Sequence, residues 1–149
     1  MEKRKLKKGK LGNYIVLGLL ICGFAQVAVV NVSAGNYADE RYTFSFGNEG
    51  DWSTTHERIK EDNTSVYMKC VSSDLVSNAY DAYAWGYDED TNNYFCSSDK
   101  YTFSEGDIKK MTNYIYENGG EWALIRANLN EGSGYTTGTF TGLWSPDSI

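Results

Sequence analysis

Hydrophobic and polar residues alternate in several short stretches after residue 40, a pattern typical of β-strands with one buried face. The clearest stretches are RYTFSF at 41–46, TSVYMKCV at 64–71 and EWALIRAN at 121–128. We therefore expect three strands here, each placing every second side chain in a core. The expected core-facing side chains are Tyr42, Phe44, Phe46, Val66, Met68, Cys70, Ala123, Ile125 and Ala127.

The stretch NAYDAYAWGY, residues 78–87, alternates small with large side chains. DEDTNN, which follows, has the composition of a turn, and YFCS at 94–97 is expected to pair with the preceding strand. Together they predict a β-hairpin. Tyr83, Trp85 and Tyr87 share the large face. If that face is exposed, three aromatic side chains form a platform for a sugar or a protein. Burial in the core is the commoner fate of such residues, and it is the expectation here.

The chain ends in GSGYTTGTFTGLWSPDSI, residues 132–149, where small residues alternate with aromatic ones. Glycines between Phe140 and Trp144 allow large rings on that face to lie over the neighbouring backbone. Pro146 ends the ladder because it has no amide hydrogen to donate. The tail is predicted to be a final strand that anchors the domain through Phe140 and Trp144.

Two segments are less clear. Residues 47–63 are predicted to be a polar connection around Trp52. SEGDIKKMTNYIYENGG, residues 104–120, has helical spacing but many β-formers, and an extended segment over 110–116 is favoured. Together the strands predict an all-β fold, a small antiparallel β-sandwich or barrel of six to seven strands after an N-terminal signal helix.

The first 34 residues predict a secretory signal peptide. A basic head is followed by an apolar run over 14–30 and by small residues up to Ala34, where cleavage is predicted, with Ala25 as the alternative. A permanent membrane anchor is the other interpretation, but the run is shorter than the roughly 20 residues that a spanning helix needs. We therefore expect one secreted domain over 35–149, with membrane contact only through the uncleaved signal peptide.

Charge narrows the range of partners. The leader holds six basic residues and one acid, so residues 35–149 keep eight basic and nineteen acidic residues, a net charge of −11. Such a surface repels a phosphate backbone, and nucleic acid is excluded as a partner. Twenty aromatic residues remain in this part of the chain, which favours a packed β-domain over disorder.

Two cysteines, Cys70 and Cys96, lie beyond the leader. An exported chain meets an oxidising medium, so the even number predicts one disulfide between them. The alternative is two separate buried thiols, because each cysteine ends an apolar face of a predicted strand.

Signs of catalysis are scarce. The single histidine, His56, lies in a polar connection, and no nucleophile elbow accompanies it, so a solvated loop histidine is expected. A glycosidase-like carboxylate pair stays open as an alternative, but the acids cluster in turns, where they are usually solvated. We expect no enzyme activity and no cofactor, and a zinc site lacks its ligand spacing.

DEDTNNYFCSSD, residues 88–99, partly matches a calcium-binding loop. Asp88, Asp90 and Asn92 fit its first half, and Asp99 stands at the twelfth position. Asn93 occupies the place that needs glycine, and Asp99 replaces the bidentate glutamate. A hydrophilic hairpin turn is therefore the favoured interpretation, and no metal is expected.

Five motifs occur in a recognisable order. A signal peptide is followed by YTFSFG, DNTSVYMKC, AYAWGY, WALIRANLN and GTFTGLWSPDS. In this order the chain resembles a group of small exported proteins of Gram-positive bacteria that are classed as a domain of unknown function. The resemblance covers nearly all of residues 35–149 and implies export and a small β-domain. It carries no catalytic residues over to this chain.

The sequence thus predicts a secreted, non-enzymatic β-domain that binds an extracellular protein or polysaccharide. Tyr83, Trp85 and Tyr87 are the candidate ligand-binding residues. Two alternatives stay open. One is a bacteriocin-like or toxin-system exported protein, against which the acidic charge argues, because membrane-active peptides are usually basic. The other is a carbohydrate-binding module.

Overall fold

The computed structural model describes residues 36–48, 50–74, 78–130, 134 and 137–149. Within this part the chain forms strands and turns and no helix, and it therefore contains no helix long and apolar enough to span a membrane. The strands are β1 (Glu40–Phe46), β2 (Trp52–Thr54), β3 (Arg58–Ile59), β4 (Val66–Ser73), β5 (Ala79–Asp88), β6 (Asn93–Cys96), β7 (Tyr101–Ser104), β8 (Ile108–Met111), β9 (Trp122–Leu129) and β10 (Gly138–Ser145).

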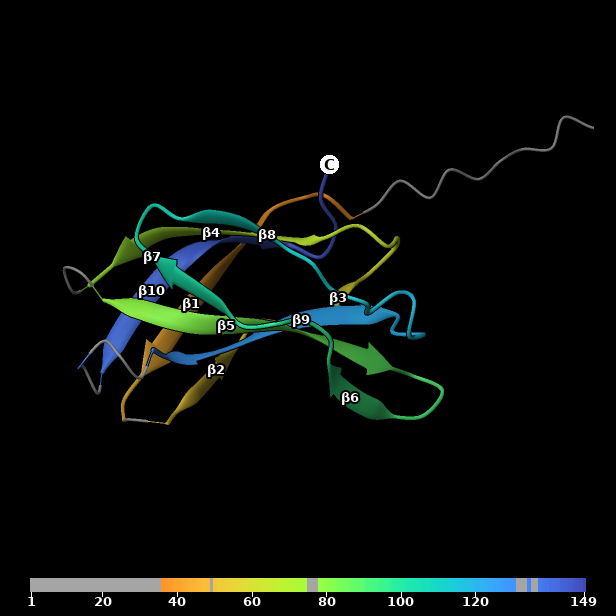
Figure 1. Cartoon of the computed structure of the whole chain (residues 1–149), viewed down its shortest axis with the longest axis horizontal. Coiled ribbons are helices and arrows are strands. Elements are labelled where there is room, and N and C mark those ends of the chain that lie inside the picture. The colour runs from red at the N-terminus through yellow and green to blue at the C-terminus, as the bar shows by residue number, and fades with distance from the viewer. Residues whose placement is uncertain (1–35, 49, 75–77, 131–133, 135–136) are drawn as a thin grey trace, which may run out of the picture. The chain divides into compact units, whose positions relative to one another are not determined.

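Two antiparallel sheets pack face to face as a sandwich, seen edge-on as two layers in Figure 1. The first sheet has the order β1-β10-β4-β8, so the first described strand pairs with the last. In the second sheet β9 and β5 lie side by side at the centre. Strands β2 and β3 pair in turn with the outer edge of β9, and β7 and β6 pair in turn with that of β5. The sheets do not close into a barrel.

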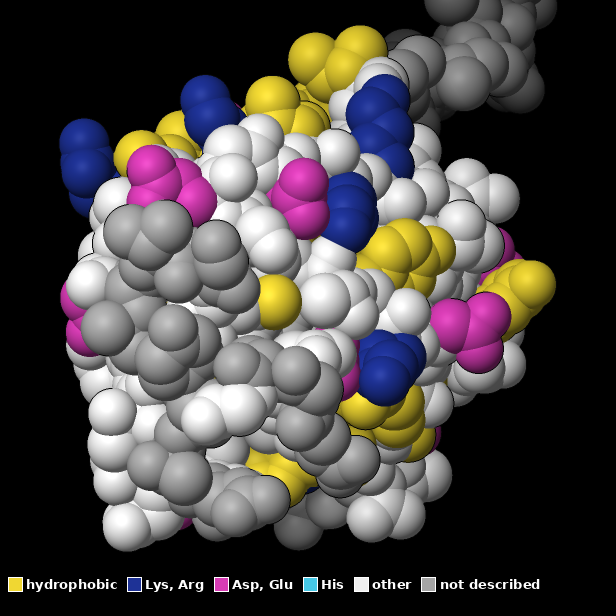
Figure 2. Space-filling view, turned by 60° about the vertical axis from the view of Figure 1, so that its left-hand side comes forward, with side chains coloured by type: hydrophobic (Ala, Val, Ile, Leu, Met, Phe, Trp, Pro, Cys, Tyr) yellow, Lys and Arg dark blue, Asp and Glu magenta, His cyan; other side chains and the backbone are white. Residues whose placement is uncertain are grey.

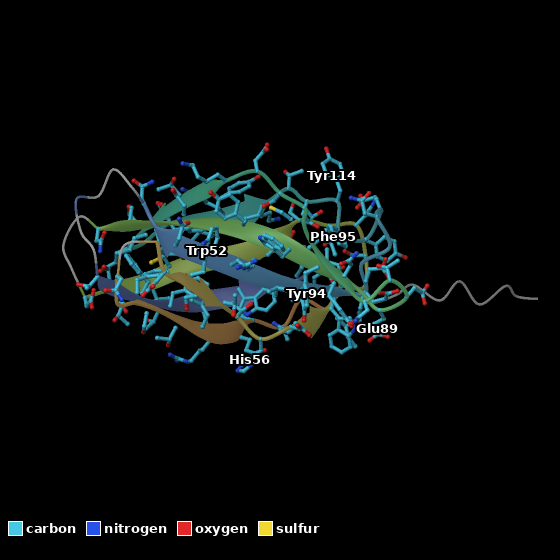
Figure 3. The ribbon with its side chains drawn as sticks, turned by 90° about the horizontal axis from the view of Figure 1, so that it is seen from below. Trp52, His56, Glu89, Tyr94, Phe95 and Tyr114 are labelled. Carbon is cyan, nitrogen blue, oxygen red and sulfur yellow. The ribbon has the colours of Figure 1, made fainter. Side chains whose placement is uncertain are left out.

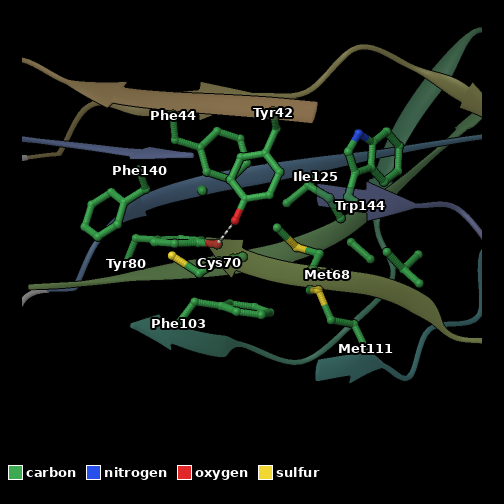
Figure 4. Packing of buried hydrophobic residues seen from close by; sticks show 14 of the residues in the cluster. Tyr42, Phe44, Met68, Cys70, Tyr80, Phe103, Met111, Ile125, Phe140 and Trp144 are labelled. Atoms are coloured by element: carbon green, nitrogen blue, oxygen red, sulfur yellow. Dashed lines mark hydrogen bonds between the residues drawn. The ribbon is translucent and has the colours of Figure 1, made fainter. Parts of the chain in front are cut away.

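The core lies between the sheets, and Figure 4 shows its aromatic part. Every core-facing side chain predicted from the alternation in the first three strands is buried. Tyr42 and Tyr80 meet across the core with their hydroxyl oxygens 2.5 Å apart, and Tyr80 stacks on Phe103 with ring centres 5.4 Å apart. Burial raises the pKa of both tyrosines, because ionisation would place a charge among apolar side chains.

The two sheets contribute side chains of different size. The first sheet supplies large ones such as Phe44, Phe140 and Trp144, whereas β5 and β9 turn small ones such as Ala84 inward. At Gly86 the space is so tight that an added Cβ would lie 2.6 Å from the ring of Phe95. The inward side of β5 thus holds Tyr80 near one end and small residues along the rest, which leaves room for the large rings opposite.

The predicted anchoring role of the tail is confirmed. In β10, Gly138, Phe140, Gly142 and Trp144 face the core, and the two aromatic side chains are almost completely buried. The ring of Tyr42 lies over Gly142, as the glycine spacing predicted: a Cβ there would lie 2.4 Å from Tyr42 Cζ. Residues 132, 133, 135 and 136 of the predicted tail lie outside the described residues.

Several boundaries differ from the prediction. The ten strands of the described residues exceed the predicted six to seven, because the polar connection at 47–63 contains the short strands β2 and β3 and because β7 forms over 101–104. The extended segment expected over 110–116 is confirmed only as far as Met111, where β8 ends, and turns follow from residue 115. Met111 and Ile115 of that stretch fill the core, while Tyr114 and Tyr116 are exposed. The predicted signal peptide, 1–34, lies outside the described residues.

The predicted disulfide is wrong. Cys70 is buried between the sheets on β4, whereas Cys96 is exposed on the outer side of β6, and both are free thiols. The second sheet separates the two side chains, and a bridge requires their Cβ atoms to approach. Burial raises the pKa of the Cys70 thiol to about 11. The alternative of two buried thiols holds for Cys70 but not for Cys96.

We expect the two thiols to differ in alkylation. In slightly alkaline buffer, iodoacetamide should label Cys96 within minutes and leave Cys70 unmodified until denaturant is added, because only exposed thiolates react. Peptide mapping by mass spectrometry reads both sites in one sample. Labelling of Cys70 at the rate of Cys96 in the native protein would contradict the packing described.

Candidate functional site: an aromatic face on the second sheet

The three candidate residues of β5 lie on the outer side of the second sheet. Tyr83, Trp85 and Tyr87 are half-buried, while their strand neighbours Ala82 and Ala84 fill the core. The expectation that these aromatic side chains belong to the core is therefore wrong. The physical reason is that Tyr80 and small residues already occupy the inward side of β5, facing the large rings of the opposite sheet.

Neighbouring strands extend this surface. Trp122 of β9 lies opposite Tyr87, Arg126 lies opposite Tyr83, and Tyr94 of β6 lies opposite Tyr87 on the other side. Because residues paired across strands point the same way, these side chains share the outer side. We call the resulting surface the aromatic face; it consists of Trp52, Tyr83, Trp85, Tyr87, Tyr94, Trp122 and Arg126.

Arg126 lies at the centre of the aromatic face. Its guanidinium carbon is 4.5 Å from the ring centre of Trp85 and 5.1 Å from that of Trp52. Trp52 in turn contacts Tyr83, with ring centres 5.7 Å apart. These cation–π and ring contacts hold the side chains in a fixed arrangement without burying them. Trp52 stays 47% exposed and is therefore accessible to a ligand.

Hydrogen bonds fix the other end of the aromatic face. Tyr87 and Tyr94 pack with ring centres 4.7 Å apart, and the Tyr94 hydroxyl donates to Glu57. This bond to a carboxylate raises the pKa of Tyr94. The indole nitrogen of Trp122 donates to Glu89 Oε1 at 2.6 Å. Figure 3 shows Trp52 and Tyr94 on this side of the molecule, and Glu89 nearby at the end of the second sheet.

Two buried polar atoms in this region have no hydrogen-bond partner among the described residues. They are the indole nitrogen of Trp85, a donor, and Oδ1 of Asn128, an acceptor. Asn128 lies opposite Trp52 on the neighbouring strand. Leaving such atoms unpaired costs about 1–3 kcal/mol each. Both atoms lie beneath the aromatic face and are not accessible to a molecule that rests on it.

The loop resembling a calcium site forms the β5–β6 turn. Asp88 accepts hydrogen bonds from the backbone nitrogens of Asp90 and Thr91, which lower its pKa together with the bond from the Thr91 hydroxyl. Asp88 and Asp90 gather with Glu121, and Asp99 is not part of this group. The carboxylates therefore stabilise a turn, and their cluster by itself does not define a cation site.

His56 is exposed between β2 and β3. His56 makes no hydrogen bond to a serine or cysteine in the described part of the chain, although a nucleophile triad requires such a bond. Sequence reasoning overlooked Trp52 and Arg126 as members of the aromatic face. Arg126 could have been found from its outward position in the clear alternation of β9, but Trp52 lies in a strand too short to predict.

Fold and site together define a β-sandwich domain with an aromatic outer face. The chain belongs to the DUF2712 family, described as proteins of unknown function, and matches it over residues 30–148. This confirms the resemblance to a domain of unknown function that the motifs indicated. No curated protein matches the chain.

Proposed function

We propose that the domain is a non-enzymatic extracellular binding protein whose aromatic face binds the sugar rings of a neutral polysaccharide. The observation that carries the proposal is the outward row Tyr83, Trp85 and Tyr87, joined by the half-exposed Trp52. Flat apolar ring faces pack on aromatic side chains, while the polar edges of a sugar need hydrogen-bond partners. Export is supported by the leader pattern at 1–34.

The polar groups of the aromatic face suit such a ligand. Arg126 offers guanidinium donors beside the two indoles. A sugar hydroxyl can accept such a hydrogen bond while the sugar ring packs on an aromatic side chain. The site is a flat sheet surface rather than a deep cleft, which fits an extended chain of sugar units.

Charge favours a neutral ligand over an anionic one. The expected net charge of −11 for residues 35–149 repels polyanions at long range. On the side shown in Figure 2, the described Lys and Arg side chains are dispersed among other residues and form no continuous basic patch. An anionic envelope polymer would therefore gain little local attraction there.

The test is co-sedimentation of the purified protein with insoluble neutral polysaccharides and with cell envelopes. We expect Trp52→Ala and Tyr87→Ala each to weaken retention at least about fivefold, by analogy with the about 1–3 kcal/mol that stacking of one ring on an aromatic side chain contributes. Circular dichroism should show that both variants stay folded.

Tyr114→Ala is the matched control, because Tyr114 is 60% exposed but belongs to the turn after β8 and not to the aromatic face. It should bind like the unchanged protein. Equal loss in all three variants, or retention that ignores Trp52 and Tyr87, would remove the aromatic face as the binding surface. Capture of an envelope protein instead of a polysaccharide would keep the surface and correct the ligand class.

A further inference from the structure

Beneath the C-terminal tail, Lys60 and Asp147 form a completely buried pair. Lys60 follows β3 and Asp147 follows β10, so the contact joins positions 87 residues apart. The Lys60 Nζ lies 2.5 Å from Asp147 Oδ1, and neither side chain has any solvent exposure. Burial of an ion pair costs several kcal/mol per ion before their attraction is counted. Loss of both charges would remove that cost.

The second oxygen of the Asp147 carboxyl group is held by the backbone. Its Oδ2 accepts hydrogen bonds from the backbone nitrogens of Asn36, at 2.7 Å, and Glu61, at 3.1 Å. Two N–H groups aimed at one carbonyl oxygen are the arrangement that stabilises a tetrahedral oxyanion in acyl transfer. The amine therefore faces one oxygen of the carboxyl group while the other is already held by two donors.

A second carboxyl group completes the cluster. Asp62 Oδ1 lies 3.8 Å from Lys60 Nζ, and the Asp62 side chain is partly exposed to solvent. Although burial by itself would raise the pKa of Asp62, hydrogen bonds from Thr64 and Tyr37 lower it below its usual value. Asp62 therefore stays ionised, a weakly basic carboxylate whose closeness to the amine places it to relay a proton.

We propose that Lys60 and Asp147 condense into an intramolecular amide bond, with Asp62 as the proton carrier. One proton passes from Nζ directly to Asp147 Oδ1, and the nitrogen lone pair then attacks Cγ. The N–H groups of Asn36 and Glu61 hold the negative charge on Oδ2. Asp62 moves a second proton from nitrogen to Oδ1, the Cγ–Oδ1 bond breaks, and one water leaves. No oxidant or reductant is needed.

The local structure fixes the amine, and a surface hollow lies beside Asp147. A second proton of Lys60 Nζ is bound by the carbonyl oxygen of Thr64 at 2.7 Å, which fixes the amine. A surface hollow of about 290 Å³ has Asp147 among its lining residues, together with Tyr67 and Lys110. The bond would close the chain between residues 60 and 147 and secure the end of β10 to the opposite sheet.

The test is the mass of the full chain, purified and denatured. We expect the unchanged protein to be lighter than its sequence by one water, whichever residue it begins with. After digestion, the peptides containing Lys60 and Asp147 should appear as one branched species. Lys60→Arg and Asp147→Ala should restore the sequence mass, and Asp62→Asn should accumulate unlinked chain.

Lys100→Arg is the control, because Lys100 forms an ion pair with Asp81 at 3.3 Å that is open to solvent. This variant should keep the mass deficit. An unchanged protein of full sequence mass would overturn the proposal without requiring any variant to fold. A mass deficit of one water in which the Lys60 and Asp147 peptides remain separate would overturn it as well. Such a deficit would arise from a succinimide at Asp147, whose formation also releases one water. Complete linkage in Asp62→Asn would remove Asp62 from the reaction.

Discussion

Replacement of Gly142 by alanine is expected to destabilise the domain by more than about 3 kcal/mol, at the upper end of overpacking effects. The new Cβ would lie 2.1 Å from the backbone oxygen of Lys69 on β4 and 2.4 Å from the Tyr42 ring. Backbone cannot yield as a flexible side chain does. Either β10 separates from β4, or Tyr42 leaves its contact with Tyr80. Urea denaturation followed by tryptophan fluorescence measures the loss.

Gly47→Ala is the matched control for this prediction. A Cβ at Gly47 would lie 3.5 Å from Asp51 Oδ2, an ordinary contact distance. We expect a change within about 0.5 kcal/mol, as for most surface substitutions. If Gly142→Ala were as mild as Gly47→Ala, the close packing of Tyr42 on β10 would be incorrect.

Trp144→Ala is expected to cost about 3–5 kcal/mol of unfolding free energy, because it empties the largest completely buried side-chain position. The same change removes the ring over which the Arg58 guanidinium lies, at 5.5 Å from the ring centre. A typical domain is stable by about 5–15 kcal/mol, so this loss is a large fraction of the total. The denaturation midpoint should shift strongly.

Trp52→Ala is the control for Trp144→Ala, because it distinguishes the effect of side-chain size from the effect of burial. It removes the same side chain from a position that is 47% exposed on the aromatic face. We expect less than about 1 kcal/mol of destabilisation, since little apolar area leaves the interior. We therefore expect different effects from the two substitutions: Trp144→Ala lowers the stability of the domain, and Trp52→Ala weakens ligand binding. Equal destabilisation by both would mean that the aromatic face is part of the core.

The sequence was informative wherever alternation was strict. The period of two in the stretches around Phe44, Met68 and Ile125 predicted the strands and their buried faces, because a strand with one solvated side must alternate. The glycine spacing around Phe140 predicted the close packing of β10. Short strands such as β2 contain too few residues for a period to be seen.

What the sequence could not show was which residues meet across the sandwich. Residue type alone favours burial of Tyr83, Trp85 and Tyr87, but Tyr80 and small residues occupy the inward side of β5. Cys70 and Cys96 were paired by their number, although a sheet lies between them. Lys60 and Asp147 gave no signal, because their burial comes from contacts between segments that are distant in sequence.

The pairing of β1 with β10 has a consequence for the timing of folding. Each residue of β1, from Glu40 to Phe46, pairs with a residue of β10 between Gly138 and Trp144. The first sheet therefore stays incomplete until β10 has been made. Such non-local pairing predicts slow folding, in milliseconds to seconds. A chain released before β10 would keep an open, aromatic-rich strand edge, which other chains could join.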